Sequence, residues 1–213
     1  MSEHRYILAA DIGQAHDYTA LVILHSYGEE RQRRHDLVQA ERFREVPYPD
    51  QVRRIRQRFD ALEQHARSSH VTARTELVVD ATGVGKPLLD ELRAAGLQAR
   101  GVQITGGTAV THANGMHHVP KRELVTTLQV ALQAKRLRIA DGLPLAEVLV
   151  REFRGFRVRI NATGHATFGN DVGTWREADH DDLVLATALG VWALEYRTRT
   201  SAKVLAQLRA AQW

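Results

Sequence analysis

Two adjacent aspartates, Asp181 and Asp182, stand directly before a long apolar run that extends from Leu183 to Tyr196. The run has the length of a helix, contains Gly190 but no proline, and is apolar on nearly all sides. Such a pattern is typical of a helix that is buried among other elements and begins at a surface. The aspartates alone can be explained as helix chemistry, because the free N–H groups of a first turn favour negative charge. Their meaning therefore depends on which other side chains the fold brings to them.

The start of the chain predicts an antiparallel sheet. Runs rich in Val, Ile and Leu, separated by turn-like stretches, indicate three sequential strands over Tyr6–Ala10, Tyr18–His25 and His35–Arg44. The turns are short, and short turns join antiparallel neighbours. Asp11 directly follows the first strand, and Asp17 lies across the first turn.

The next part of the chain predicts a strand, a helix and a strand that pair in parallel. A helix with apolar residues at helical spacing precedes a buried strand that ends at Asp80. A short helix that Gly96 terminates and a further strand follow, and such a unit forms a right-handed parallel crossover. In order, these elements are Gln51–Arg67 with Asp50 as its cap, Glu76–Val79, Lys86–Ala95 and Leu97–Ile104.

The remaining chain completes an α/β fold. Residues Thr105–Val119 are rich in Gly and His without periodicity, and we interpret them as a mobile loop. We find no internal repeat or boundary, so residues 1–197 are predicted to form one domain and residues 198–213 a last helix or a tail. The other expected elements are a helix over Lys121–Ala134 that Pro120 starts, an edge strand over Leu137–Ile139, a helix over Leu143–Phe153, and a hairpin with strands over Phe156–Ile160 and His165–Phe168.

Composition favours a nucleic-acid partner and excludes several other classes. The chain has no cysteine, which excludes disulfides and thiolate metal sites. No apolar run is long enough to cross a bilayer and no signal peptide precedes the first strand, so we expect a cytoplasmic protein without a membrane partner. The net charge is +4, mostly from arginine, which suits a polyanion. The arginines that we select as DNA contacts lie in the first predicted helix and in the hairpin: Arg53, Arg54, Arg56, Arg157 and Arg159.

Two of the predicted strands end in aspartate, at Asp11 and Asp80. Each could be a simple turn former, but ligand sites in open α/β sheets lie beyond the strand ends, where the two carboxylates would meet. The helix that starts with Asp181 and Asp182 would bring a third, and Asp17 a fourth. Gathered carboxylates repel one another by about 4 kcal/mol per close pair at an effective dielectric near 20, so they require protons or cations. Oxygen ligands favour Mg²⁺ or Mn²⁺, and two such ions can cleave a phosphodiester.

Five short segments occur in a definite order along the chain: Asp11-Ile12-Gly13, Asp17-Tyr18-Thr19-Ala20, Val79-Asp80-Ala81-Thr82-Gly83-Val84-Gly85, Pro120-Lys121 and His180-Asp181-Asp182-Leu183-Val184. Together they resemble the C-terminal nuclease domain of phage terminase large subunits, which belongs to the ribonuclease H-like superfamily. The resemblance runs from about residue 5 to residue 197. It implies a ribonuclease H-like mixed central sheet, antiparallel in its first three strands and then parallel, flanked by helices.

The resemblance also implies an activity, the cleavage of double-stranded DNA with two divalent ions during genome packaging. The metal ligands would be Asp11, Asp80 and one of the pair Asp181 and Asp182, with Asp182 favoured, and the ions would be Mg²⁺ or Mn²⁺. The other implied site residues are Asp17, as an accessory carboxylate, and Lys121, which would approach the scissile phosphate or remain an exposed lysine in a first helical turn.

The chain does not carry an ATPase motor motif. Gly83–Pro87 superficially resembles a phosphate-binding loop, but the first glycine is missing at the required spacing and Pro87 replaces the Ser or Thr that would hold magnesium. We therefore expect an isolated nuclease domain, a separately encoded nuclease subunit or a prophage remnant, in the host cytoplasm if it is phage-encoded. A separate ATPase motor, a small terminase subunit and a portal protein would be its partners, together with double-stranded DNA.

Other functions stay open from the sequence alone. The residues also fit a junction-resolving or repair nuclease of the same superfamily, and a basic DNA-binding module whose site is degenerate. A sugar-kinase-like ATPase is a further alternative, although a second phosphate-binding domain is missing. Histidines in the first turn and the predicted loop, which include His16, His112, His117 and His118, would form a zinc site or face solvent. His180 would cap the late helix or orient a carboxylate.

Overall fold

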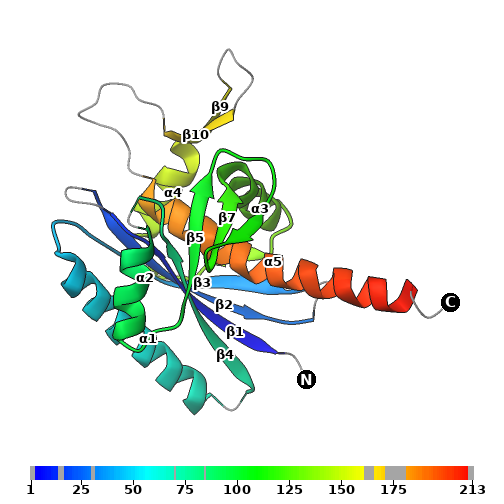
Figure 1. The fold of residues 1–213 in the computed structure, drawn as a ribbon, viewed down its shortest axis with the longest axis horizontal. Coiled ribbons are helices and arrows are strands. Elements are labelled where there is room, and N and C mark those ends of the chain that lie inside the picture. The colour runs from blue at the N-terminus through cyan, green and yellow to red at the C-terminus, as the bar shows by residue number, and fades with distance from the viewer. Residues whose placement is uncertain are drawn as a thin grey trace.

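The computed structural model of the protein has an α/β arrangement of strands and helices (Figure 1). The structure describes residues 3–13, 17–29, 32–69, 71–83, 85–160, 166–170 and 181–210. The strands are β1 (His4–Asp11), β2 (Thr19–Tyr27), β3 (Arg34–Phe43), β4 (Ala73–Asp80), β5 (Ala99–Thr105), β6 (Thr111–Ala113), β7 (Met116–Pro120), β8 (Leu137–Ile139), β9 (Phe156–Ile160) and β10 (Ala166–Asn170). The helices are α1 (Tyr48–Ser68), α2 (Gly85–Ala94), α3 (Lys121–Gln133), α4 (Ala146–Gly155) and α5 (Asp182–Ala210).

The central sheet of the described residues is mixed and has the strand order β6-β7-β5-β4-β1-β2-β3-β8. β1, β2 and β3 form an antiparallel meander, in which Ile7 is paired with Leu24 and Val22 with Ala40. β4 pairs parallel with β1, and β5 pairs parallel with β4 after the crossover through α2. The predicted sheet, antiparallel in its first three strands and then parallel, is confirmed.

Alternation along β1 divides the core into two layers. Ile7 and Ala9 belong to the cluster that α3, α4 and α5 complete, whereas Tyr6 and Leu8 belong to the cluster that α1 and α2 complete. Figure 1 shows these helices around the sheet. Successive side chains of a strand point to opposite faces, so a strand between two layers of helices must be apolar throughout. β1 meets this requirement because residues 6–10 are all apolar and buried.

One of the two layers is built around α5, as the apolar run at its start predicts. Leu189 and Trp192 are almost completely buried, and the helix packs across β1, β2 and β4. At Gly190 the helix lies so close to the sheet that a Cβ atom would be 2.5 Å from Leu24 Cδ1 and 3.2 Å from Ala9 Cβ. The absence of a side chain at this position therefore sets the distance between helix and sheet. Across the described part of the chain, no helix combines the length and apolar character that a membrane span requires.

The region that we expect to be a mobile loop contains a β-hairpin, so this prediction is wrong. β6 and nearly all of β7 lie in Thr105–Val119 and pair antiparallel, and β7 extends the parallel half of the sheet beside β5 as far as Pro120. Such short strands carry too little periodicity to be recognised by pattern. The signal that indicates the hairpin is Asn114-Gly115, whose φ angles of 55° and 76° are both positive. A two-residue turn of type I′ requires two positive φ angles, and Asn-Gly is its preferred sequence.

The start of α1 also differs from the prediction. The helix begins at Tyr48 with Pro47 in the cap position, and Pro49 lies in the first turn, where its missing N–H would have no partner in any case. Asp50 therefore lies inside the first turn and does not cap the helix. Its carboxylate pairs with Arg53 at 2.6 Å.

Two later helices differ in length from the prediction. α4 begins at Ala146 and not at Leu143, because Leu145 has a φ of 66°, which lies outside the helical region. α5 continues as one helix to Ala210, so the described residues after 197 extend the buried helix. The division of the chain after residue 197 stays a prediction.

Gly190→Val should destabilise the protein by about 1–3 kcal/mol, the usual range for overpacking a core. The new side chain would be driven into Leu24 and Ala9, which are fully buried and have no room to move. The free energy of unfolding would be measured by urea denaturation. Gly106→Val is the matched control, because no atom lies within 4 Å of a Cβ at that position. Equal stabilities of the two variants would contradict the close approach of α5 to the sheet.

Candidate active site

The ends of β1 and β4 bring Asp11 and Asp80 to neighbouring positions. The two strands run parallel with Ala10 paired to Val79, so the next residue on each strand is an aspartate. Neighbouring strands lie ~4.8 Å apart. Two residues before each aspartate, at Ala9 and Val78, the side chain belongs to the core layer beneath α5. Alternation therefore places both carboxylates on the α5 face of the sheet.

The first turn of α5 brings two more carboxylates to this face. The N–H of Leu185 donates to the carbonyl oxygen of Asp181 at 2.9 Å, so Asp181 immediately precedes the helix and Asp182 is its first residue. α3 begins nearby, and Lys121 Nζ lies 3.5 Å from Asp181 Oδ2. Carboxylates from β1, β4 and α5 and the ammonium group of α3 thus meet at one edge of the sheet.

The electrostatic environment of Asp11 links these groups into one site. Burial raises the pKa of Asp11 well above its ordinary value, and the charges of Asp80, Asp182 and Asp181 raise it further. Lys121 acts in the opposite direction and lowers that pKa. A half-buried carboxylate beside three like charges and a single ammonium group readily takes up a proton or a cation.

A turn holds Asp80 in place after β4. Asp80 Oδ1 accepts a hydrogen bond from the Thr82 N–H at 2.8 Å, and the Thr82 hydroxyl accepts one from the Ile104 N–H at 2.8 Å. Burial raises the pKa of Asp80, whereas the hydrogen bonds from Thr82 and the charge of Lys121 lower it. The threonine of the Asp-Ala-Thr-Gly motif therefore orients the carboxylate and ties the end of β4 to β5.

The turn after Asp11 is fixed by buried polar groups. The Gly13 N–H donates to the Thr19 hydroxyl at 3.0 Å, and that hydroxyl donates to Gln51 Oε1 at 2.8 Å. A Cβ at Gly13 would overlap the carbonyl oxygen of Tyr18, so the backbone can pass here only with glycine. These contacts connect the end of β1 to the start of β2 and to α1.

Glu152 on α4 is a neighbour of the site that the sequence motifs do not indicate. It is 3% exposed, its Oε2 accepts a hydrogen bond from the Val184 N–H at 3.0 Å, and its Oε1 pairs with Arg42 Nη1 at 3.1 Å. Burial raises the pKa of Glu152 to about 7; the Val184 N–H and Arg42 lower it, and the charge of Asp182 raises it. The sequence feature that could indicate Glu152 is its spacing. It lies one turn after Leu149 on the apolar side of the predicted helix, where a carboxylate without a partner would be too costly.

The donor chemistry of this edge fits Mg²⁺ or Mn²⁺, which prefer oxygen ligands. The predicted metal ligands Asp11, Asp80, Asp181 and Asp182 offer carboxylate oxygens only. Within the described ranges, no three His, Asp or Glu side chains already surround a common point as the ligands of a bound ion would. Like charges repel by about 4 kcal/mol per close pair at an effective dielectric near 20, so a bound cation would stabilise this group of carboxylates.

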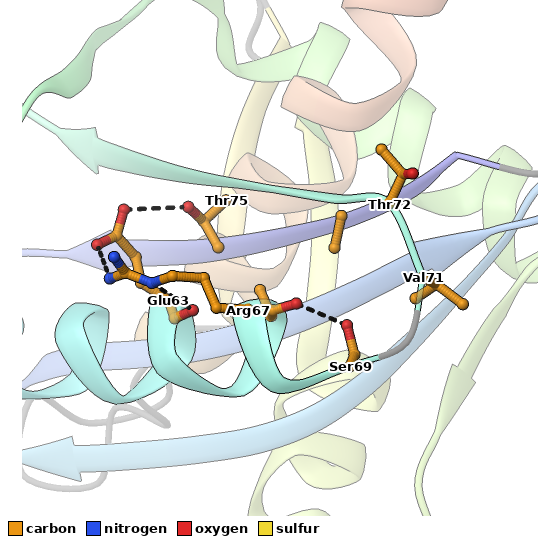
Figure 2. Close-up of a pocket in the computed structure, with 8 residues that line it drawn as sticks. Glu63, Arg67, Ser69, Val71, Thr72 and Thr75 are labelled. Carbon is orange, nitrogen blue, oxygen red and sulfur yellow. Dashed lines mark hydrogen bonds and ion pairs between the residues drawn. The ribbon is translucent and has the colours of Figure 1, made fainter.

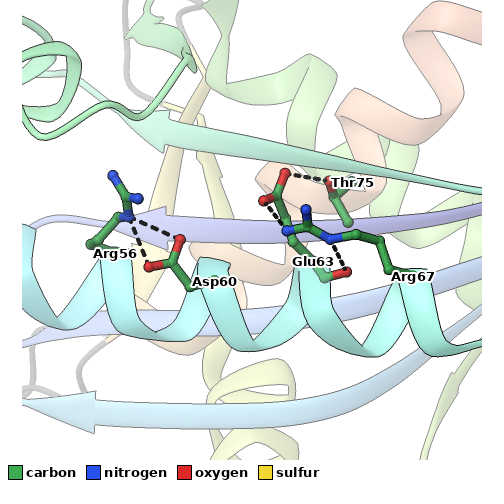
Figure 3. A network of polar contacts seen from close by, with 5 residues as sticks. All are labelled: Arg56, Asp60, Glu63, Arg67 and Thr75. Atoms are coloured by element: carbon green, nitrogen blue, oxygen red, sulfur yellow. Dashed lines mark hydrogen bonds and ion pairs between the residues drawn. The ribbon is translucent and has the colours of Figure 1, made fainter.

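The structure does not bring the arginines of α1 to these carboxylates. α1 covers the face of the sheet opposite to α5 (Figure 1). Their selection as DNA contacts stays a prediction, and the ion pairs reduce the charge that they offer to a polyanion. These pairs join Arg53 to Asp50, Arg54 to Glu41 and Arg56 to Asp60, the last of which Figure 3 shows.

For three other predicted residues, Asp17, Arg157 and Arg159, the structure does not show a place in the site. Asp17 is exposed between β1 and β2, and it is not among the charges that shift the pKa of Asp11. Its accessory role stays a prediction. Arg157 and Arg159 belong to β9, which pairs with β10 in a separate two-stranded sheet, and their side chains lie outside the described residues.

The histidines do not assemble a zinc site in the described part of the chain. His112 and His117 lie on the β6–β7 hairpin with ring centroids 4.8 Å apart. Burial lowers the pKa of His117 to about 4, and the charges of Arg100 and His112 contribute in the same direction. His16 and His180 lie outside the described residues.

A surface groove lies at the opposite end of β4 from Asp80. The end of α1 and the start of β4 line it, and Glu63, Arg67 and Thr75 are among its residues (Figure 2). Arg67 pairs with Glu63 at 2.9 Å and the Thr75 hydroxyl donates to the same carboxylate at 3.4 Å, which satisfies the charge of the groove internally (Figure 3). The groove is therefore not part of the carboxylate site.

Comparison with known proteins identifies the fold. No protein-family model matches the chain, and no curated protein matches it. Among solved structures, the large terminase nuclease from thermophilic phage G20c is 22% identical to this chain, with a TM-score of 0.58. The alignment covers 89% of this chain and 82% of the G20c chain. The same nuclease with bound magnesium is 22% identical, with 88% and 80% covered and a TM-score of 0.58. The P22 large terminase nuclease domain is 15% identical, with 92% and 82% covered and a TM-score of 0.51. The chain thus has the ribonuclease H-like fold of large terminase nucleases, as the motif order predicts.

Asp11→Asn should stabilise the metal-free protein at pH 8, because burial and the neighbouring carboxylates raise the pKa of Asp11 well above its ordinary value. The pKa of Asp11 is higher in the folded than in the unfolded chain, so the wild type loses stability as the pH rises above about 4 and through the folded pKa. Asparagine removes this loss, and the gain should vanish near pH 3. Thermal unfolding in EDTA across this pH range would measure the difference.

The exposed Asp141→Asn is the matched control, because Asp141 is not among the charges that act on Asp11. Addition of MgCl₂ should raise the melting temperature of the wild type more than that of Asp11→Asn, because the cation relieves a repulsion that the variant lacks. A variant that is less stable than the wild type at pH 8 would contradict the crowding of charge at this edge.

Proposed function

We propose that this protein is a divalent-metal-dependent endonuclease that cleaves double-stranded DNA during phage genome packaging. The observation that carries the proposal is the environment of Asp11, where the charges of Asp80, Asp181 and Asp182 act together on one half-buried carboxylate. Such crowding is unfavourable for folding, and strongly perturbed carboxylates at strand ends are typical of functional sites. The fold supports the same conclusion, because its match in phage G20c is a large terminase nuclease that binds magnesium.

Asp11, Asp80 and Asp182 are the proposed metal ligands. Two Mg²⁺ or Mn²⁺ ions held there would activate a water molecule and stabilise the leaving oxygen of a phosphodiester. The protein itself fixes the ligands in advance: Thr82 orients Asp80 through its N–H, and the first turn of α5 carries Asp182. Ligands held by strand ends and a helix start need little rearrangement when substrate arrives, which favours the transition state.

Lys121 is the proposed phosphate contact. It stands at the start of α3 and its Nζ lies 3.5 Å from Asp181 Oδ2, so its ammonium group is next to the metal ligands. There it can pair with a non-bridging oxygen of the scissile phosphate. Its pairing with Asp181 also restrains that carboxylate, which leaves Asp182 as the favoured direct ligand. Asp17 remains the proposed accessory carboxylate, because it lies in the turn that follows β1.

The charge of the chain fits a DNA substrate. The net charge is +4, and a basic surface around carboxylates that hold cations suits a polyanion. Contacts to phosphates position DNA without reading its sequence, so little sequence preference is expected. In packaging, the nuclease would act with an ATPase motor, a small terminase subunit and a portal protein, which are its proposed partners.

Asp80→Asn should lower the rate of plasmid cleavage with Mn²⁺ or Mg²⁺ by at least about 100-fold, the upper end of the effect of residues that only orient a metal ligand. The amide cannot supply the negative charge that the ion requires. Nicking and linearisation of supercoiled plasmid on agarose gels would measure the rate, with EDTA as the blank and Asp141→Asn as the matched control.

Cleavage that survives in Asp80→Asn, or that proceeds in EDTA, would contradict the proposed mechanism. If a four-way junction is cut much faster than linear duplex, the function is junction resolution and not packaging. Metal-independent DNA binding without any cleavage would identify a non-catalytic DNA-binding module.

The double variant Arg157→Ala/Arg159→Ala should weaken DNA binding and reduce its salt dependence, because the slope of log K against log salt falls by about 0.9 for each phosphate that an arginine no longer neutralises. Fluorescence anisotropy with a short duplex in EDTA buffer would measure both. The comparison variant is Arg53→Ala/Arg56→Ala, whose effect should be smaller because Asp50 and Asp60 already pair with these arginines. If Arg53→Ala/Arg56→Ala has the larger effect, the result would indicate that DNA binds to the α1 face.

A further inference from the structure

Glu152 connects the start of α5 to two other elements. It is supplied by α4, its Oε2 accepts the Val184 N–H of α5 at 3.0 Å, and its Oε1 pairs with Arg42 Nη1 of β3 at 3.1 Å. The side chain is 3% exposed, whereas Glu147 on the same helix is exposed to solvent. A buried carboxylate is retained at little cost only when its partners satisfy both oxygens, as they do here.

The contacts of Glu152 separate it from the metal ligands. One oxygen faces a backbone amide of α5 and the other faces a guanidinium group, so neither is directed at an ion shared with Asp11. Arg42 is itself held from the other side, because its guanidinium carbon lies 4.2 Å from the centre of the Tyr18 ring. This clamp prevents Glu152 from turning toward the carboxylate cluster.

The Val184 N–H that donates to Glu152 has no carbonyl partner within α5. The first N–H groups of an α-helix have no carbonyl partner within the helix, and an acceptor from outside fixes the direction of the first turn. Asp182 is in that turn, two residues before Val184. A rotation or fraying of the turn would carry the Asp182 carboxylate away from Asp11 and Asp80. Partners that orient a metal ligand typically change metal affinity by roughly 10- to 100-fold when removed.

We propose that Glu152 is a positioning residue of the metal site, which holds the first turn of α5 so that Asp182 faces Asp11 and Asp80. This inference rests on the proposed metal-dependent nuclease function. Arg42 supports this role, because its ion pair with Glu152 keeps the carboxylate in place. The site thereby depends on a side chain that touches neither substrate nor metal.

The test is Mn²⁺ affinity, measured without DNA by electron paramagnetic resonance of the free ion. Glu152→Ala and Glu152→Asp should both weaken binding by roughly 10- to 100-fold, the second because its shorter side chain withdraws the acceptor from Val184. Glu152→Gln should lie between these variants and the wild type, because its amide oxygen still accepts the Val184 N–H whereas its NH₂ group faces the Arg42 guanidinium, which is also a donor. Glu147→Ala is the matched control on α4 and should not change the affinity. Duplex binding in EDTA should be equal in all variants that melt cooperatively.

Two results would overturn the inference. If Glu152→Asp and Glu152→Ala bind Mn²⁺ as the wild type does while Asp80→Asn does not bind it, Glu152 has no positioning role and the proposed function stands. If Asp80→Asn also binds Mn²⁺ normally, the metal site itself is misplaced and both proposals fail. Should Glu152→Ala not fold, Glu152→Asp and Glu152→Gln decide the matter, because both retain a polar group in the buried position.

Discussion

Repulsion among carboxylates at one edge of the sheet is the constraint on which this structure depends. Asp11 lies beside Asp80, Asp181 and Asp182, and one ammonium group, that of Lys121, partly offsets their charge. No arrangement of this kind forms by itself, because each close pair of like charges costs about 4 kcal/mol at an effective dielectric near 20. The surrounding fold must hold the groups together until a cation neutralises them.

The fold provides this restraint through its core. β1 is apolar on both faces and anchors two layers, while α5 lies against the sheet at Gly190 with almost no space between them. The burial of a single large apolar side chain such as Leu189 contributes about 1.5–3 kcal/mol, less than the cost of one charge pair, so several such contacts are needed to offset it. Many such contacts along β1, β4 and α5 allow the ends of these elements to carry unfavourable charge.

The part of the site that the sequence predicts comes from residues whose role follows from local structure. Asp11 and Asp80 are recognisable because each ends an apolar strand, and Asp182 because it starts an apolar helix. Glu152 reaches the site through a contact between α4 and α5, and no local rule indicates such a contact between separate elements. Periodicity likewise misses the β6–β7 hairpin, whose only local signal is the Asn-Gly turn.

Charge patterns along the sequence are less informative than patterns of apolar residues. The arginines of α1 form a basic cluster in the sequence, yet the structure places them on the opposite face from the carboxylates and pairs them with acidic neighbours such as Asp50 and Asp60. Net positive charge therefore predicts a class of partner but not the surface that binds it. The apolar pattern, in contrast, defines the strands and the buried helix, because burial requires a match over many residues.

The central claim is that Asp11, Asp80 and Asp182 converge to bind divalent cations. A crystal of the protein soaked in MnCl₂, with diffraction data collected at the manganese absorption edge, tests it most directly. The account predicts anomalous density between these three carboxylates, with Asp181 turned toward Lys121. Manganese bound elsewhere, or an Asp11 carboxylate that faces away from the other two in the presence of the ion, would contradict it.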